Sequence, residues 1–360
     1  MKLSDLAARS LPALASTAIL VGAALAATPA AQPAYAQSVA DFYKGKTLSI
    51  YISSGEGGTN DAYARLIANY IGRHIPGNPL VVPRNLPGAG GLKAANFLYD
   101  VAPKDGTAYG VLQRGTIIQP LVDIQSANYD GSKFNWIGST AREVSVGVVW
   151  TASTDVRTLQ DAMKKEVIVG SSGVGNDTGA FPLVLNRFLG TQFKPIHGYK
   201  SGSEITLAFE RGEVQGRVGW SWGSVKSRGS EWLDSKKITI LVQMGVGKAD
   251  DLPDVPLALD LAKTPEDRAA MQLIFSPTYI GWPSVMPPGV PADRVAAVRA
   301  AYMKTMTDKD FVAGADKQQL ELDPLDGEAI QKIVMQLYAL PPAAIELARV
   351  AMNPPEDGKK

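Results

Sequence analysis

The stretch SSGEGGTND, residues 53–61, separates the apolar alternating run KTLSIYIS (46–53) from AYARLIANYIGRHI (62–75). The alternation predicts a strand, and the apolar spacing of the second run predicts a helix. Three glycines and several hydroxyl, amide and carboxylate side chains fill the short join between them. A loop of this composition, opening a helix, presents backbone N–H groups that attract an anion.

The N-terminus has the pattern of a secretory signal. Lys2 and Arg9 precede the apolar run LPALASTAILVGAALAA, and Ala34-x-Ala36 matches a cleavage pattern. We predict a signal peptide over residues 1–36, cleaved after Ala36, and an exported mature chain. An uncleaved membrane anchor is the alternative, but the apolar run is short for a spanning helix.

Composition excludes several classes of function. The predicted signal contains Lys2, Asp5 and Arg9, so 34 of the 36 basic and 34 of the 35 acidic residues remain in the mature chain. This neutral balance lacks the dense basic surface that nucleic-acid binding needs. The chain has no cysteine, which excludes disulfides and thiolate chemistry, and only two histidines, His74 and His197. We expect no cofactor, no metal and no nucleic-acid partner.

Predicted strands and helices alternate along the mature chain, which favours an α/β fold with parallel sheets covered by helices. Further strands are predicted at 79–85, 108–115, 145–151, 214–222 and 237–245, and 166–175 is predicted to be a strand that ends in a glycine loop. Further helices are predicted at 91–101, 158–164, 178–190, 205–213, 291–306 and 327–351. Pro341 and Pro342 make the last of these two helices or one kinked helix.

Two motifs suggest enzymes but lack the residues that those enzymes need. GWSWG (219–223) satisfies the G-x-S-x-G elbow of α/β-hydrolases, yet both histidines precede Ser221, and that fold places its histidine after the serine. The weak pattern after Ser221 also predicts no helix there, so we interpret Ser221 as a turn or wall residue. The glycine-rich loops lack the lysine of a P-loop and the register of a dinucleotide-binding loop.

Two loops share a composition and occur in different halves of the chain. SGEGGTND and GSSGVGNDT both join a strand end to a helix start. Both carry residues suited to helix N-capping, namely Thr59, Asn60, Asp61, Asn176, Asp177 and Thr178. Facing each other, the two loops would hold a carboxylate through helix N-termini and hydroxyl groups. Tight strand-to-helix turns with no ligand are the alternative interpretation.

An ordered set of segments carries a family resemblance. FYKGKTLSIYISSGEGGTNDAYARLIANYI, VVPRNLPGAGGLKAANFLY, APKDGTAYGVLQRGT, GSSGVGNDTG, YKSGSEITLAFERGEVQGRVG and LPDVPLALD follow one another along nearly the whole mature chain. In this the chain resembles the solute-binding proteins of tripartite tricarboxylate transporters, the Bug receptor family.

The resemblance implies a two-domain periplasmic Venus-flytrap fold with two crossover strands. The expected domains are residues 42–141 plus 278–360, and residues 142–277. The implied function is capture of a small carboxylate (a di- or tricarboxylate or an aromatic acid) and delivery to permease subunits in the membrane, by a monomer that is not an enzyme. A binding protein of another transporter class and the ligand subunit of a sensor are alternatives, and a hydrolase is a third.

Carried over by position, the resemblance implies a set of ligand contacts in the loops after the strands. These are Gly57, Gly58, Thr59, Asn60, Asp61, Gln113, Arg114, Gly115, Thr116, Ser171, Ser172, Gly175, Asn176, Thr178, Tyr199, Gly202 and Ser203.

The chain departs from the family pattern at the far end of the expected pocket. Arg114 stands where small hydroxyl residues are usual, and Glu56 adds a carboxylate to the first loop. Arg114 would pair a second ligand carboxylate, or else lie at the surface or pair with Glu56. Trp220 and Trp222 point the same way if 217–222 is a strand, and would line the ligand pocket or pack in the core.

Overall fold

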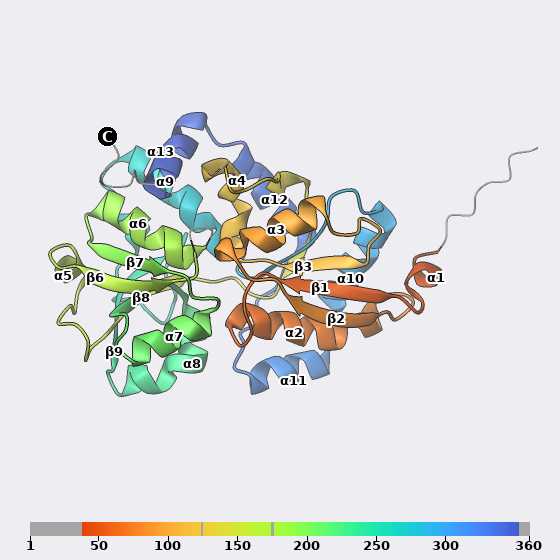
Figure 1. Cartoon of the computed structure of the whole chain (residues 1–360), viewed down its shortest axis with the longest axis horizontal. Helices are drawn as coiled ribbons and strands as arrows, with labels where there is room; N and C mark the ends of the chain where they lie inside the picture. The colour runs from red at the N-terminus through yellow and green to blue at the C-terminus, as the bar shows by residue number, and fades with distance from the viewer. Residues whose placement is uncertain (1–37, 124, 174–175, 353–360) are drawn as a thin grey trace, which may run out of the picture. The chain divides into compact units, whose positions relative to one another are not determined.

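The computed structural model describes residues 38–123, 125–173 and 176–352. The predicted signal peptide (1–36), its cleavage point after Ala36 and the predicted contact Gly175 lie outside the described residues. Within the described chain, two mixed sheets with helices on their faces form an α/β fold (Figure 1).

The first sheet has six strands in the order β11-β4-β10-β3-β1-β2. Its strands are β1 Thr47–Ile52, β2 Leu80–Asn85, β3 Ala108–Val111, β4 Asn135–Ser139, β10 Pro283–Met286 and β11 Leu325–Asp326. The helices before, between and after them are α1 Val39–Tyr43, α2 Thr59–Ile71, α3 Leu92–Asp100, α4 Gln119–Val122, α10 Ala292–Met306, α11 Lys309–Lys317, α12 Gly327–Tyr338 and α13 Pro342–Met352.

The second sheet has five strands in the order β7-β6-β8-β5-β9. Its strands are β5 Ser145–Trp150, β6 Val167–Ser171, β7 Phe193–His197, β8 Gly216–Ser221 and β9 Ile238–Met244. The helices that accompany it are α5 Leu159–Ala162, α6 Asp177–Leu189, α7 Gly202–Glu210, α8 Trp222–Asp234 and α9 Pro265–Phe275.

The sheets are mixed, so the expectation of parallel sheets holds in part: β1 pairs in parallel with β2 and β3, and β6 with β7 and β8. In the first sheet β10 runs antiparallel to β3 and β4, and in the second β5 runs antiparallel to β8 and β9. Two consecutive strands can pair in parallel only if a crossover connection, usually a helix, returns the chain to the end of the sheet where the first strand began. Strands β5 and β10 are reached by passing from one sheet to the other, so they enter in the opposite direction.

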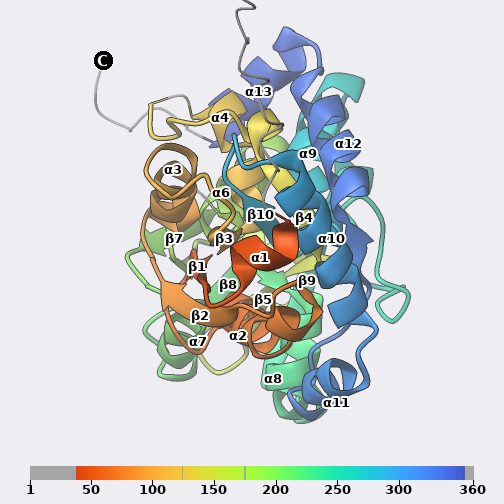
Figure 2. The ribbon, with the colours of Figure 1, turned by 90° about the vertical axis from the view of Figure 1, so that its right-hand side faces the viewer.

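The chain passes between the sheets twice, as predicted: from β4 to β5, and from β9 through α9 to β10. The predicted break near Pro341 is also confirmed, because α12 and α13 are separate helices at 94° to each other. Helix α13 packs against α4, α6 and α9 (Figure 2). Among the described residues no single helix is long and apolar enough to span a membrane. The bent pair α12 and α13 reaches that length and apolarity only when both helices are counted together.

Alternation along β1 explains how the first loop is positioned. Leu48, Ile50 and Ile52 are fully buried and join the cluster that includes Ile67 of α2. Strand β1 pairs in parallel with β2 and β3, so its end lies beside theirs. Loops that follow the carboxyl ends of parallel strands therefore meet at one edge, which is where ligands bind in open α/β sheets.

Strand β8 corrects the prediction for the two tryptophans. Gly219, with φ +82°, is an extra residue where the pairing of β8 with β5 shifts register. The strand ends at Ser221, whose side chain accepts a hydrogen bond from Ser224 N and so caps α8. Trp222 is thus the first residue of a helix, and its Nε1 donates to Asp251 Oδ1 at 2.7 Å. The helix that we did not expect after Ser221 is present.

Candidate functional site

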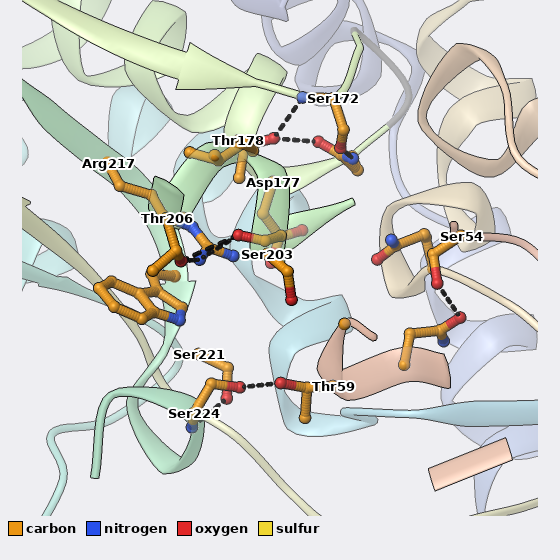
Figure 3. A pocket seen from close by; sticks show the side chains of 18 of the residues that line it. Ser54, Thr59, Ser172, Asp177, Thr178, Ser203, Thr206, Arg217, Ser221 and Ser224 are labelled. Atoms are coloured by element: carbon orange, nitrogen blue, oxygen red, sulfur yellow. Dashed lines mark hydrogen bonds between the residues drawn. The ribbon is translucent and has the colours of Figure 1, made fainter. Parts of the chain in front are cut away.

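A cavity of about 340 Å³ lies between the loops of the two sheets (Figure 3). It is lined by the loops after β1, β3 and β6, by β8, and by α7 and α8. The predicted contacts that line it are Gly58, Thr59, Asn60, Gln113, Arg114, Ser172, Asn176, Thr178, Gly202, Ser203 and Trp220. Tertiary structure thus brings residues from five distant segments to one place.

Several predicted contacts do not line this cavity. They are Gly57, Asp61, Gly115, Thr116, Ser171, Tyr199 and Trp222. Tyr199 lines a neighbouring cavity of about 240 Å³, together with the loop 87–91. Ser171 Oγ accepts a hydrogen bond from Gly173 N and bonds His197 Nδ1 at 2.9 Å.

The first turns of four helices surround the cavity: α2, α6, α7 and α8. Side chains cap three of them, with Asn176, Ser201 and Ser221 as the N-cap residues. Helix α2 differs, because its N-cap is Gly58 and no side chain caps it. Its first N–H groups therefore remain available to an anion, and the positive ends of all four helices favour negative charge in the cavity.

The capping predictions are correct only in the second loop. Asn176 caps α6 by accepting from Gly179 N, and Thr178 Oγ1 donates to Asn176 Oδ1 at 2.7 Å. In the first loop Asn60 instead accepts a hydrogen bond from Ser54 Oγ at 3.1 Å (Figure 3). The expectation that Thr59, Asn60 or Asp61 caps α2 is wrong, because the helix already begins at Thr59.

Asp61 holds the first loop in position through hydrogen bonds of its side chain. Its carboxylate accepts hydrogen bonds from Gly57 N at 2.9 Å, Arg65 Nε at 3.0 Å and Asn85 Nδ2 at 2.8 Å. Asn85 also donates to Ser54 O at 2.9 Å. These bonds tie both ends of the loop to β2 and α2, so Asp61 positions the loop and does not point into the cavity.

The loops of the two sheets contact each other around the cavity. Gly55 N donates to Lys200 O at 3.0 Å, and Ser203 Oγ donates to Gly57 O at 2.7 Å. Thr59 Oγ1 and Ser224 Oγ share a hydrogen bond of 2.7 Å (Figure 3). The cavity is therefore enclosed by contacts that join segments on either side of it.

Arg114 has a buried partner that the sequence did not indicate. Only 4% of Arg114 is exposed; its Nε donates to Asp177 Oδ2 at 2.6 Å, and its Nη2 donates to Ser145 Oγ at 2.6 Å. Glu56 lies instead 3.7 Å from Arg65, with its side chain 82% exposed. The surface and Glu56-paired alternatives for Arg114 are both wrong.

Arg217 lines the cavity and was missed. It donates hydrogen bonds to Gly202 O and Thr206 Oγ1, at 3.1 and 3.0 Å, and lies 4.5 Å from the ring centre of Trp220 (Figure 3). The sequence did contain a signal for Arg217: it is the one charged residue of the strand GRVGWS, and a charge in a mostly buried strand needs fixed polar partners.

Neither histidine meets Ser221. His74 Nε2 bonds Asp308 Oδ2 at 2.7 Å, and His197 bonds Ser171. Burial lowers the pKa of His197. The elbow-like geometry of Ser221 therefore lacks the histidine that a hydrolase needs, although a helix does follow it. Among the described residues no cluster of three potential metal-ligating side chains is found.

A buried carboxyl lies where the chain first passes between the sheets. Glu143 Oε1 accepts from Trp282 Nε1 at 3.0 Å, and Trp282 lines the cavity. Burial raises the pKa of Glu143, against the opposing effects of Arg114 and of hydrogen bonds with Ser221 and Trp282. The folded state therefore favours the protonated acid more than the unfolded chain does.

Replacing Glu143 by glutamine should flatten the pH dependence of stability. An acid with a raised pKa in the folded state contributes stability below its unfolded pKa, about 4.3, and loses it as pH rises through the folded value. Glu143→Gln stays neutral and keeps an acceptor for Trp282. We expect its melting temperature to equal that of the wild type near pH 4 and to exceed it near pH 8.

Thermal melts across this pH range test the effect. The matched control is Glu328→Gln, since the Glu328 side chain is 86% exposed, and this variant should follow the wild-type curve. A Glu143→Gln protein that is less stable than the wild type near pH 8 would contradict the prediction.

Comparison with known proteins gives a consistent result. No family model matches the chain. It is 28% identical over 240 residues to the "UPF0065 protein in gbd 5'region" of Cupriavidus necator, covering 64% of this chain and 68% of that protein. Its structure is similar to the periplasmic binding protein BugD, with a TM-score of 0.67, 18% identity, and coverage of 86% and 98% of the two chains.

A second similar structure is MatC from Rhodopseudomonas palustris with bound malate, with a TM-score of 0.64, 20% identity, and coverage of 86% and 99%. The fold is that of the two-domain periplasmic binding proteins, as predicted. The resemblance to the Bug family of solute-binding proteins is likewise confirmed.

Proposed function

We propose that the chain is a solute-binding receptor of the Bug type. It captures a small organic carboxylate in the periplasm and delivers it to the membrane permease of a tripartite tricarboxylate transporter. The receptor acts as a monomer, without a cofactor and without catalysing a reaction.

One observation carries the proposal: the first turns of four helices converge on one cavity between two sheets. Each helix N-terminus stabilises an anion by roughly 0.3–1 kcal/mol, and more where water is excluded. Helix α2, without a side-chain cap, offers its N–H groups directly. Such donors bind small anions, carboxylates among them. MatC, which has the same fold, has malate bound, and this supports a carboxylate here.

We further propose that residues 42–141 plus 278–360 and residues 142–277 are the two domains, which close on the ligand. Two features support closure. The chain passes between the sheets twice, and hydrogen bonds such as Ser203 to Gly57 and Thr59 to Ser224 join the two sides of the cavity. A ligand held by loops from both sides stabilises the closed arrangement.

Thermal shift with a panel of small mono-, di- and tricarboxylates tests the binding function. A ligand at 100 times its dissociation constant adds about 2.7 kcal/mol to the free energy of unfolding, which raises the melting temperature by several degrees. We expect such a shift with at least one carboxylate and none with its uncharged amide. Equal shifts with acid and amide, or no shift with any acid in the panel, would contradict the proposal.

A further inference from the structure

The Arg114 guanidinium has one amino group without a protein acceptor. Nε and Nη2 are bound by Asp177 and Ser145, but none of the described residues accepts a hydrogen bond from the buried Nη1. The side chain is 5% exposed and lines the cavity. Buried donors in native proteins are almost always satisfied, so Nη1 requires an acceptor, which an oxygen of a ligand in the cavity would supply.

The charge of Asp177 determines whether Arg114 Nη1 would bind a charged or an uncharged ligand oxygen. It is the first residue of α6, and its carboxylate contacts the guanidinium directly at 2.6 Å. Ser145 Oγ also donates to it, at 3.3 Å. Its position is fixed by β8, since a Cβ at Gly219 would lie 2.8 Å from Asp177 Cβ. Arg114 thus already has its counter-charge.

A second carboxylate at Nη1 would be unfavourable. It would lie beside the Asp177 carboxylate, which already pairs with Arg114 and whose side chain is only 10% exposed. Like charges in such a site repel strongly because water does not screen them. A hydroxyl or carbonyl oxygen satisfies Nη1 without this repulsion.

The anionic group of the ligand has a different place in the cavity. The uncapped start of α2 faces the start of α7: a Cβ on Gly58 would lie 3.7 Å from Gly202 N. Arg217 adds a positive charge on the same wall, held by Gly202 O and Thr206 Oγ1 (Figure 3). A carboxylate in the cavity beside these two helix starts would be stabilised by their N-termini and by the guanidinium.

We infer that the cavity selects a carboxylate whose other end carries an uncharged oxygen, a hydroxyl or carbonyl group, which Arg114 Nη1 recognises. This inference rests on the proposed function and narrows its ligand class. It is an alternative to the expectation that Arg114 pairs with a second ligand carboxylate.

Matched ligands separate the possibilities. For chains of four to six carbons, calorimetry compares the unsubstituted acid, the ω-hydroxy acid and the dicarboxylic acid, for example pentanoate, 5-hydroxypentanoate and glutarate. We expect the hydroxy acid to bind about 10-fold tighter than the unsubstituted acid, as a hydrogen bond to a charged donor provides. The dicarboxylate should bind more weakly than the hydroxy acid.

Two variants test the cause. Asp177→Asn removes the counter-charge at nearly constant volume, so the dicarboxylate should gain about 10-fold relative to the hydroxy acid. Arg114→Met should abolish the preference for the hydroxy acid over the unsubstituted acid. The control is Asp293→Asn, which changes an exposed aspartate in the first turn of α10 and should leave all ratios unchanged.

The outcomes are distinguishable even if a variant does not fold, because the wild-type comparison stands alone. A dicarboxylate that binds the wild type tightest at every length would overturn this inference and leave the proposed function intact. Binding of none of these acids, together with a failed thermal-shift panel, would overturn both.

Discussion

We expect the Gly219→Ala variant to lose ligand binding and to melt well below the wild type. Gly219 has φ +82°, a conformation that costs an alanine about 1–2 kcal/mol. Its added Cβ would also lie 2.6 Å from the backbone carbon and 2.7 Å from the backbone oxygen of Asp177. Relieving this overlap costs about 1–3 kcal/mol more and moves the start of α6, with Asp177, away from Arg114.

Denaturant unfolding and calorimetry measure the two effects. The control is Gly212→Ala, because Gly212 has φ +72° but a Cβ there would meet nothing within 4 Å. It shares the backbone strain and lacks the overlap, so the difference between the variants isolates the contact with Asp177. Equal losses of stability in both, with ligand affinity retained in Gly219→Ala, would show that this contact does not position the site.

The second large effect is expected from Asp61→Asn. The change keeps the size of the side chain but places an amide group among the donors Gly57 N, Arg65 Nε and Asn85 Nδ2. Leaving such donors without a carboxylate costs about 1–3 kcal/mol. We expect the loop to move and the affinity for a carboxylate to fall about 10- to 100-fold, or about 1.4–2.7 kcal/mol.

Calorimetry with the acid that gives the largest thermal shift measures this loss. The control is Asp326→Asn: Asp326 caps α12 by accepting from Ala329 N at 2.7 Å and does not line the cavity. It should lower stability slightly and leave affinity unchanged. An Asp61→Asn protein with wild-type affinity would mean that the loop keeps its shape without this carboxylate.

Local patterns in the sequence were sufficient for the elements around the first loop. Alternation over 46–53 predicted β1, observed at Thr47–Ile52, and apolar spacing over 62–75 predicted α2, observed at Thr59–Ile71. These patterns are informative because side chains two apart in a strand, or three to four apart in a helix, lie on the same face, so a buried face appears in the sequence as a short repeat of apolar residues. The strand predicted over 214–222 was too long, because the pattern does not show the bulge at Gly219 or the cap at Ser221.

The sequence by itself determined the α/β class and the presence of anion-attracting loops at strand ends, since these follow from periodicity and turn residues. The two passages between the sheets were implied by the family resemblance. Only the tertiary structure decided which charges meet. Arg114 and Asp177 are 63 positions apart, and Arg217 meets the start of α7 through the pairing of β8. A charge on a side chain is visible in the sequence, but its effect depends on distance and burial, and long-range packing alone sets both.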